Sequence, residues 1–347
     1  MFWYNLLRWY VRLGLKFYFR RIIIKGTENI PDHAVIFAAN HQNAFMDALL
    51  IICFNPHLTN SLARADIFKR SVARRLLNWL RLIPVYRIRD GWQALDQNHE
   101  TFAECTRRFI RKEAVIIFPE GNHGMERRLR PLSRGFTRLS YEALKIQPGL
   151  PLSVIPVGLN YSAPQEFRSD VSIYFGKPIH ASDYFKEPLA VSANRFRDRL
   201  TKDLQHLIIH VDPSLPYESV IQELKTSGAD FLDPEETNKR IAEIASGQKL
   251  PVPASQRKAN ALKAVVSIMS MLIHLVPLLS WHVIRNRIKD PVFQTSIRFA
   301  LGIFAIPLWY LVGGLILYLI LGWKATMIFL LLSFILLPML LFRQPSE

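Results

Sequence analysis

Cysteine is scarce in this chain of 347 residues, which has only Cys53 and Cys105. Two cysteines cannot form a disulfide framework, and no CxxC or Cys/His spacing typical of a metal site occurs. We therefore expect both to be small buried side chains of a protein from a reducing compartment. The sequence gives no reason to predict a metal ion or a cofactor.

Acidic residues are also few, 28 against 44 basic ones, which leaves a net charge of +16. Such an excess fits three partners, namely nucleic acid, an anionic membrane surface or a phosphorylated substrate. No nucleic-acid motif occurs, and the aromatic residues fall in apolar runs and not on base-stacking platforms. We therefore predict anionic membrane lipids as a partner and no nucleic acid.

Charge is missing altogether from three stretches of the C-terminal third, residues 264–281, 299–323 and 325–342. These runs reach the length of a membrane helix. Buried helices of a soluble core are the alternative, which the clustering at one end and the lack of an amphipathic period disfavour.

The distribution of Lys and Arg predicts how these runs meet the membrane. If all three spanned it, the basic loop 282–298 would lie opposite the N-terminal domain, against the positive-inside rule. We therefore predict an interfacial or re-entrant helix over 262–284 and a hairpin of 299–321 and 325–342. The protein would then be a membrane protein whose active site lies on the cytosolic face.

Residues 1–21 do not resemble a secretory signal, because charges interrupt the apolar run every four residues. These charges are Arg8, Arg12, Lys16 and Arg20. A basic stripe opposite aromatics and leucines predicts an amphipathic helix in the membrane interface. An amphipathic helix packed on its own domain is the alternative.

Residues 22–210 alternate short apolar runs with longer helical segments, which predicts an α/β domain with a mostly parallel central sheet flanked by helices. The expected strands are 35–39, 82–86, 114–118, 153–158 and 171–175. The expected helices are 43–53, 67–80, 92–111, 134–145 and 191–209. Residues 211–260 form a proline-punctuated polar extension and linker with modest helices at 217–226 and 234–246, and residues 261–347 form the membrane-associated region.

Two polar segments follow predicted strands and carry most of the functional information, Asn40–Asp47 and Phe118–Gly124. Residues six apart do not share a helix face, so His41 and Asp47 meet only if a turn separates the strand from the next helix. Asp47 would then fix one nitrogen of His41 and leave the other as a base. A capping or core histidine is the alternative.

The second segment offers Glu120, which would order a hydroxyl or a nearby arginine, and Gly121, which lets the backbone approach a ligand closely. A β-turn with Glu120 as a helix cap is the alternative. Arg87 follows another strand and Arg134 precedes a helix, and either could clamp a phosphate or carboxylate. Neither segment contains a serine elbow, a Walker loop or a dinucleotide fingerprint, so direct attack by an acceptor hydroxyl on an activated acyl group fits better than a covalent acyl-enzyme.

The segments resemble, in order, four motif blocks of the glycerolipid acyltransferase superfamily, which includes lysophosphatidate and glycerol-3-phosphate acyltransferases. The blocks are Asn40–Asp47, Ile83–Arg87, Phe118–Gly121 and Val154–Gly158, within roughly residues 22–182. The resemblance implies an enzyme with His41 as base and Asp47 as its partner. It further implies that Arg87, Glu120 and Gly121 hold the acceptor phosphate, that Pro156 shapes the acyl side, and that the donor is acyl-CoA or acyl-carrier protein.

One departure concerns the acceptor. The family usually has four residues between the histidine and the aspartate, whereas this chain has five, as in glycerol-3-phosphate/dihydroxyacetone-phosphate acyltransferases. The first expectation is a membrane-bound O-acyltransferase acting on lysophosphatidate in phospholipid synthesis. The alternatives are glycerol 3-phosphate or another lysolipid as acceptor and, from other classes, a non-catalytic membrane scaffold or a basic nucleic-acid binder.

Overall fold

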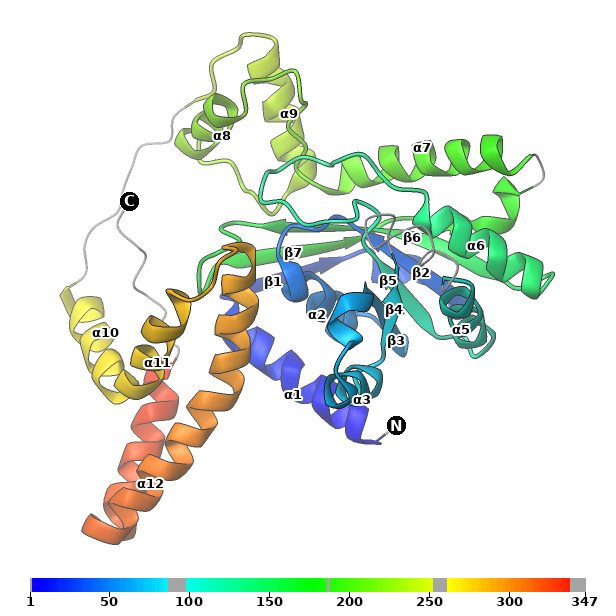
Figure 1. Cartoon of the computed structure of the whole chain (residues 1–347). Helices are drawn as coiled ribbons and strands as arrows, with labels where there is room; N and C mark the ends of the chain where they lie inside the picture. The colour runs from blue at the N-terminus through cyan, green and yellow to red at the C-terminus, as the bar shows by residue number, and fades with distance from the viewer. Residues whose placement is uncertain (1, 87–97, 186–187, 252–260, 338–347) are drawn as a thin grey trace.

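The computed structural model describes residues 2–86, 98–185, 188–251 and 261–337. An eight-stranded sheet lies at its centre in the order β1-β7-β6-β2-β5-β3-β4, with β8 beside β6 (Figure 1). The strands are β1 (Arg21–Lys25), β2 (Ala34–Ala39), β3 (Thr59–Arg64), β4 (Leu82–Val85), β5 (Ala114–Ile117), β6 (Leu152–Tyr161), β7 (Asp170–Phe175) and β8 (Ile179–His180). Strands β6, β2, β5, β3 and β4 run parallel, whereas β7 and β8 are antiparallel to β6. The predicted mostly parallel sheet is confirmed.

Helices cover both faces of this sheet, and strand β2 shows why. All six of its residues are buried, as expected for a central parallel strand. Val35 and Phe37 face the core that contains α1 (Phe2–Tyr18) and α2 (Ala44–Phe54). Ile36 and Ala38 face the core formed with three other helices. These are α5 (Asn98–Ile110), α6 (Gly135–Ile146) and α7 (Leu189–Leu207).

Three strands escaped the prediction, β1, β3 and the two-residue β8, because none of them carries a long apolar run. Strand β3 begins Thr59-Asn60-Ser61, and these polar side chains are buried. Strand β1 is three isoleucines between charged residues. The predicted helix 67–80 is instead the short helix η2 (Ala65–Phe68) followed by α3 (Ser71–Trp79). The first part of the predicted helix 92–111 lies outside the described residues.

Pro156 occupies the interior of β6, where a proline normally removes a hydrogen bond from the sheet. Its position explains why it is tolerated. Residues Ser153 and Val154 pair with β8, and the pairing with β7 begins only at Val157. Pro156 therefore falls where the antiparallel neighbour changes, and its carbonyl accepts from Gly176 N at 2.8 Å.

The extension after the sheet domain packs on the chain just behind the second polar segment. It contains α8 (Tyr217–Thr226) and α9 (Pro234–Ala245), which share a small apolar core. The Tyr217 hydroxyl accepts from Arg127 N at 2.8 Å, and the Arg127 guanidinium lies 4.2 Å from the Phe231 ring centre. The extension thus supports the segment that follows Gly124.

The C-terminal region consists of α10 (Ala261–Ile273), α11 (Leu275–Arg285) and α12 (Val292–Leu336). By length and composition α12 is the one helix of the described residues that could cross a membrane alone, and the bent pair Val265–Ile273 and Leu275–Arg285 could supply a second span. Gly322 interrupts α12 with φ 80°, and Tyr310 on the first arm donates to Ser333 O on the second at 3.1 Å. The two arms lie side by side as a hairpin (Figure 1).

Helix α1 packs on the domain through apolar residues of its C-terminal half, and two of its arginines contact the end of α2. The Arg8 guanidinium donates to the carbonyls of Asn55 and His57, and that of Arg12 lies 5.1 Å from the Phe54 ring centre. Trp3 and Trp9 are 68% and 60% exposed. Helix α1 therefore buries Leu15 and Tyr18 in the core near its C-terminal end, whereas Trp3 and Trp9 face outward and Lys16 is also exposed.

Gly158→Ala should destabilise the fold, because α7 ends directly against β6. A Cβ at position 158 would lie 2.2 Å from the main-chain oxygen of Leu207. We expect the free energy of unfolding to fall by about 3 kcal/mol, the cost of overpacking a rigid contact, in thermal or denaturant unfolding in detergent. Gly302→Ala is the control, since a Cβ there meets nothing within 4 Å. Equal stability of the two variants would contradict the close approach.

Candidate active site

The two polar segments meet at one edge of the sheet. Strands β2 and β5 are parallel neighbours, and Ala38 pairs with Ile117. Their carboxyl ends therefore deliver His41 and Glu120 to the same place, where open α/β sheets build their sites. The Asn40 side chain fixes the exit of β2, since it donates to Leu159 O at 3.0 Å and accepts from Leu159 N at 2.8 Å.

Asp47 is fully buried and lies at the centre of the turn that joins β2 to α2. Its Oδ2 accepts from His41 Nδ1 at 2.8 Å and from the backbone N–H groups of Gln42 at 2.8 Å and Asn43 at 2.7 Å. Its Oδ1 accepts from the Tyr161 hydroxyl at 2.5 Å. Asp47 also lies in the first turn of α2, where the helix dipole favours an anion. The predicted turn between His41 and the helix is present.

The ring of His41 has a defined orientation. Its Nδ1–H donates to Asp47, so Nε2 is the nitrogen left as acceptor. The Phe118 ring stacks on it with centroids 3.9 Å apart, and the His123 ring stands perpendicular to it at 5.8 Å. The His41 side chain retains 17% exposure, enough for contact with a substrate.

Glu120 holds the backbone of His41. Its Oε1 accepts from His41 N at 2.8 Å, and its Oε2 accepts from Arg130 Nε at 2.5 Å. Burial raises the pKa of the Glu120 carboxyl, while Arg130 and the His41 N–H oppose that rise. The expectation that Glu120 orders a nearby arginine agrees with this geometry.

Gly121 and Gly124 shape the second segment. Gly121 has φ 75°, a left-handed conformation that favours glycine, and its N–H donates to Phe118 O at 3.0 Å. Gly124 N donates to His41 O at 3.0 Å. The backbone of His41 is thus held by the second segment at both its N–H and its carbonyl.

The other residues predicted for the site lie elsewhere or are not described. Arg134 Nη2 donates to Asn194 of α7 at 3.1 Å, so its guanidinium contacts a helix and not Glu120. Arg87 lies outside the described residues. Pro156 is buried within β6 beside Ala38, four residues before Asn160 and not at the carboxyl end of that strand.

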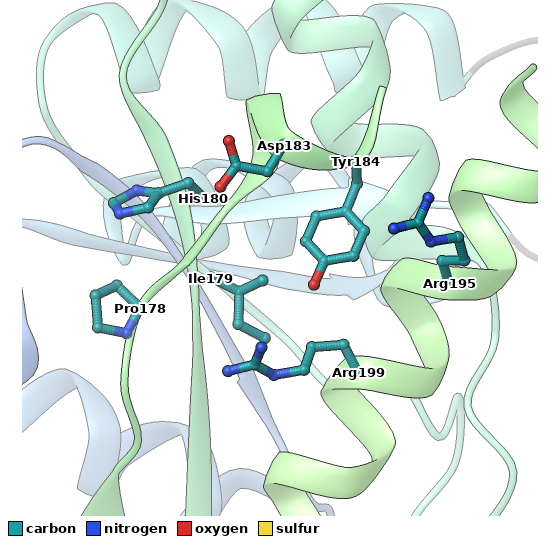
Figure 2. A pocket seen from close by; sticks show the side chains of 7 residues that line it. All are labelled: Pro178, Ile179, His180, Asp183, Tyr184, Arg195 and Arg199. Atoms are coloured by element: carbon teal, nitrogen blue, oxygen red, sulfur yellow. The ribbon is translucent and has the colours of Figure 1, made fainter. Parts of the chain in front are cut away.

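A cavity of about 210 Å³ lies away from this site (Figure 2). Its lining comes from β8, the following turn and α7, and includes His180, Tyr184, Arg195 and Arg199. Ile179 of this lining pairs with Val154, in the amino-terminal half of β6. The cavity is therefore at the opposite end of the sheet strands from His41.

Sequence reasoning missed Tyr161, Arg130 and His123 as members of the site. Burial and the adjacent Asp47 raise the pKa of Tyr161 well above its usual value, so the hydroxyl stays protonated and donates to Asp47. Tyr161 belongs to β6, and no spacing rule links it to a residue 114 positions earlier. His123 stands within a predicted segment, where a second histidine beside Glu120 was the available signal.

The arrangement has the parts needed to remove a proton from a hydroxyl. An imidazole with one nitrogen fixed by a buried carboxylate presents the other as a general base. Among the described residues no cluster of His, Cys, Asp and Glu that could hold a metal ion is found.

Tyr161→Phe should leave Asp47 Oδ1 buried without its hydroxyl donor. We expect the free energy of unfolding to fall by about 1–3 kcal/mol, because an unsatisfied buried charge is costly. Tyr174→Phe is the matched control, since its hydroxyl donates to a neutral carbonyl, Leu232 O, from a half-exposed position. Chemical denaturation of both variants gives the comparison, and an equal loss would contradict the role of the carboxylate.

Comparison with known proteins agrees with this geometry. Residues 21–160 match the Acyltransferase family model. An uncharacterized acyltransferase of Schizosaccharomyces pombe is 32% identical over 85 residues, 24% of this chain and 12% of that protein. Glycerol-3-phosphate O-acyltransferase 2 of Saccharomyces cerevisiae is 28% identical over 119 residues, 34% of this chain and 16% of that protein.

The matched segments span less than a fifth of these relatives' lengths. The crystal structure of the 1-acyl-sn-glycerophosphate acyltransferase from Thermotoga maritima aligns with 54% of this chain and 72% of its own, at 18% identity and a TM-score of 0.39. Residues 21–160, which contain His41, Asp47 and Glu120, are a domain of the Acyltransferase family.

Proposed function

We propose that this protein is a membrane-bound O-acyltransferase of phospholipid synthesis, with acyl-CoA or acyl-carrier protein as donor. The leading acceptor is lysophosphatidate, and glycerol 3-phosphate or another lysolipid is the alternative. The observation that carries the proposal is the imidazole of His41, fixed by buried Asp47 inside an acyltransferase domain.

In the proposed reaction His41 Nε2 takes the proton of the acceptor hydroxyl. The hydroxyl oxygen attacks the thioester carbonyl, and the tetrahedral intermediate collapses with cleavage of the carbon–sulfur bond. The proton on His41 then passes to the departing thiolate, so ester and thiol are the products and the base is regenerated. Asp47 stabilises the imidazolium formed between these steps.

The acceptor phosphate needs cations near His41. By the family resemblance we assign it to Arg87 and to the backbone at Gly121, with Glu120 acting indirectly; Arg134, whose guanidinium contacts Asn194 of α7, is not part of this assignment. Arg130 is an additional cation near His41. Its Nε donates to Glu120, and its Nη2 donates to His41 O at 3.3 Å. Glu120 would orient Arg130 and not meet the phosphate itself, since two anions repel.

Membrane attachment is supported by exposed apolar side chains on α1 and α12. Phe2, Trp3 and Trp9 of α1 are exposed, as are Phe304 and Leu308 of the hairpin. The two helices touch, since the Tyr10 hydroxyl donates to Ile303 O. Such a patch on one side of a protein is typical of a lipid-facing surface.

His41→Ala should lower the rate of acyl transfer about 10²–10⁴-fold, the usual contribution of a positioned base, without loss of the folded circular dichroism spectrum. The assay offers glycerol 3-phosphate, lysophosphatidate and other lysolipids, each with both donor types, to purified protein in lipid vesicles. His206→Ala, on the exposed side of α7, is the control. Near-normal turnover by His41→Ala would place the base elsewhere.

The proposed orientation predicts different labelling at two exposed positions. In intact cells, a cysteine replacing Lys324, at the tip of the hairpin, should react with a membrane-impermeant thiol reagent added outside. A cysteine replacing Arg287 should not, because it would lie on the cytosolic side with the domain. The native Cys53 and Cys105 are buried and give little background. Labelling at position 287 would refute this orientation.

A further inference from the structure

The first turn of the C-terminal hairpin contacts the groups that surround His41. The contacts come from residues 290–295, outside the 21–160 acyltransferase domain. Asp290 precedes α12, and Phe293 and Thr295 lie in its first turn. Asp290 and Phe293 both contact His123, and Thr295 contacts the carbonyl of Pro164.

Asp290 binds the histidine that stands beside the base. Its Oδ2 lies 2.9 Å from His123 Nε2, and its Oδ1 accepts from Val292 N at 3.1 Å. The bonds from His123 and from the Val292 N–H, in that order, lower the pKa of the Asp290 carboxyl, so it is anionic at neutral pH. The His123 ring, held in this way, stands perpendicular to the ring of His41.

Phe293 and Thr295 connect the first turn of α12 to groups near His41 and Asp47. The Phe293 ring lies 5.2 Å from His123 and 6.1 Å from Phe45 of α2, the helix that carries Asp47. Thr295 Oγ1 donates to Pro164 O at 2.9 Å, and the same carbonyl accepts from Asn43 Nδ2 at 2.8 Å. One carbonyl therefore joins the hairpin to the turn that binds Asp47.

We infer that Asp290 is a positioning residue of the active site, which holds His123 against the ring of His41 and so completes the site from outside the acyltransferase domain. This role rests on the proposed function, in which His41 is the base. Phe118 stacks on the ring of His41 and Asp47 fixes its Nδ1, and among the described residues His123 is a third side chain against the ring. Even a small displacement of a general base lowers the rate of the reaction that it assists.

The test compares Asp290→Ala with Asp290→Asn. Asparagine keeps a polar group toward both Val292 N–H and His123 Nε2, whereas alanine removes both contacts. We expect Asp290→Ala to lower kcat on the order of tenfold with little change in KM, and Asp290→Asn to restore most of it. Asp203→Asn, which breaks the exposed pair with Arg199 on α7, should leave kcat unchanged.

A second measurement does not require the acyltransferase activity. Diethyl pyrocarbonate modifies accessible imidazoles, and mass spectrometry gives the rate at His41 separately. Release of His123 should raise this rate several-fold in Asp290→Ala and not in Asp290→Asn. If no acceptor is acylated by the unaltered protein, the proposed function fails while this measurement still decides the positioning role.

Two results would overturn the inference. The first is an Asp290→Ala variant that matches Asp203→Asn both in kcat and in the modification rate of His41. The second is an Asp290→Asn variant as impaired as Asp290→Ala, because the polar contact with His123 would then be irrelevant.

Discussion

The buried carboxylate of Asp47 is the constraint on which the site depends. With no exposure to water, it is tolerable only because four donors surround it, His41 Nδ1, two backbone N–H groups and the Tyr161 hydroxyl. Five residues lie between His41 and Asp47. Ala44 begins α2 with φ 43°, a left-handed conformation that costs an alanine about 1–2 kcal/mol. The hydrogen bonds from the backbone N–H groups of Gln42 and Asn43 to Asp47 hold this turn closed.

The sequence predicted the sheet class and the meeting of His41 with Asp47, because both depend on local patterns. Apolar runs locate buried strands, and the polar residues that end them fall at one sheet edge. Strands β1, β3 and β8 were missed. Strand β3 buries Thr59 and Asn60, which no hydrophobicity pattern marks, and β1 and β8 are only five and two residues long. Tyr161 and Asp290 could not be predicted, because they reach the site from segments distant in the sequence. Arg130 lies only ten positions after Glu120, but no pattern singles it out among the arginines of that stretch. Arg134 was predicted for the site from its place before a helix, but its side chain contacts Asn194 of α7.

The charge of the protein is distributed differently from what its total suggests. The basic stripe of α1 was expected to meet lipid head groups, yet Arg8 and Arg12 contact the carbonyls and the aromatic ring at the end of α2. Trp3 and Trp9 of α1 face outward. Of the charges on α1, Arg8 is therefore engaged with main-chain carbonyls of the domain. Attraction to anionic lipids would come from cations that stay exposed, such as Lys16 of α1 and Arg287 before the hairpin.

The C-terminal region connects the exposed apolar surface to the residues around His41. If the hairpin were attached only by a linker, its position would not affect the structure of the acyltransferase domain. Here α12 packs against α1 through Ile303 and reaches the turn that joins β2 to α2 through Thr295 and Pro164. Because helices move as rigid rods over such short distances, a displacement of the hairpin must also move Asp290 and Phe293 relative to His123. Under the proposed function, lipid around the apolar arms would then fix the orientation of His123 against His41, which links membrane attachment to the active-site geometry.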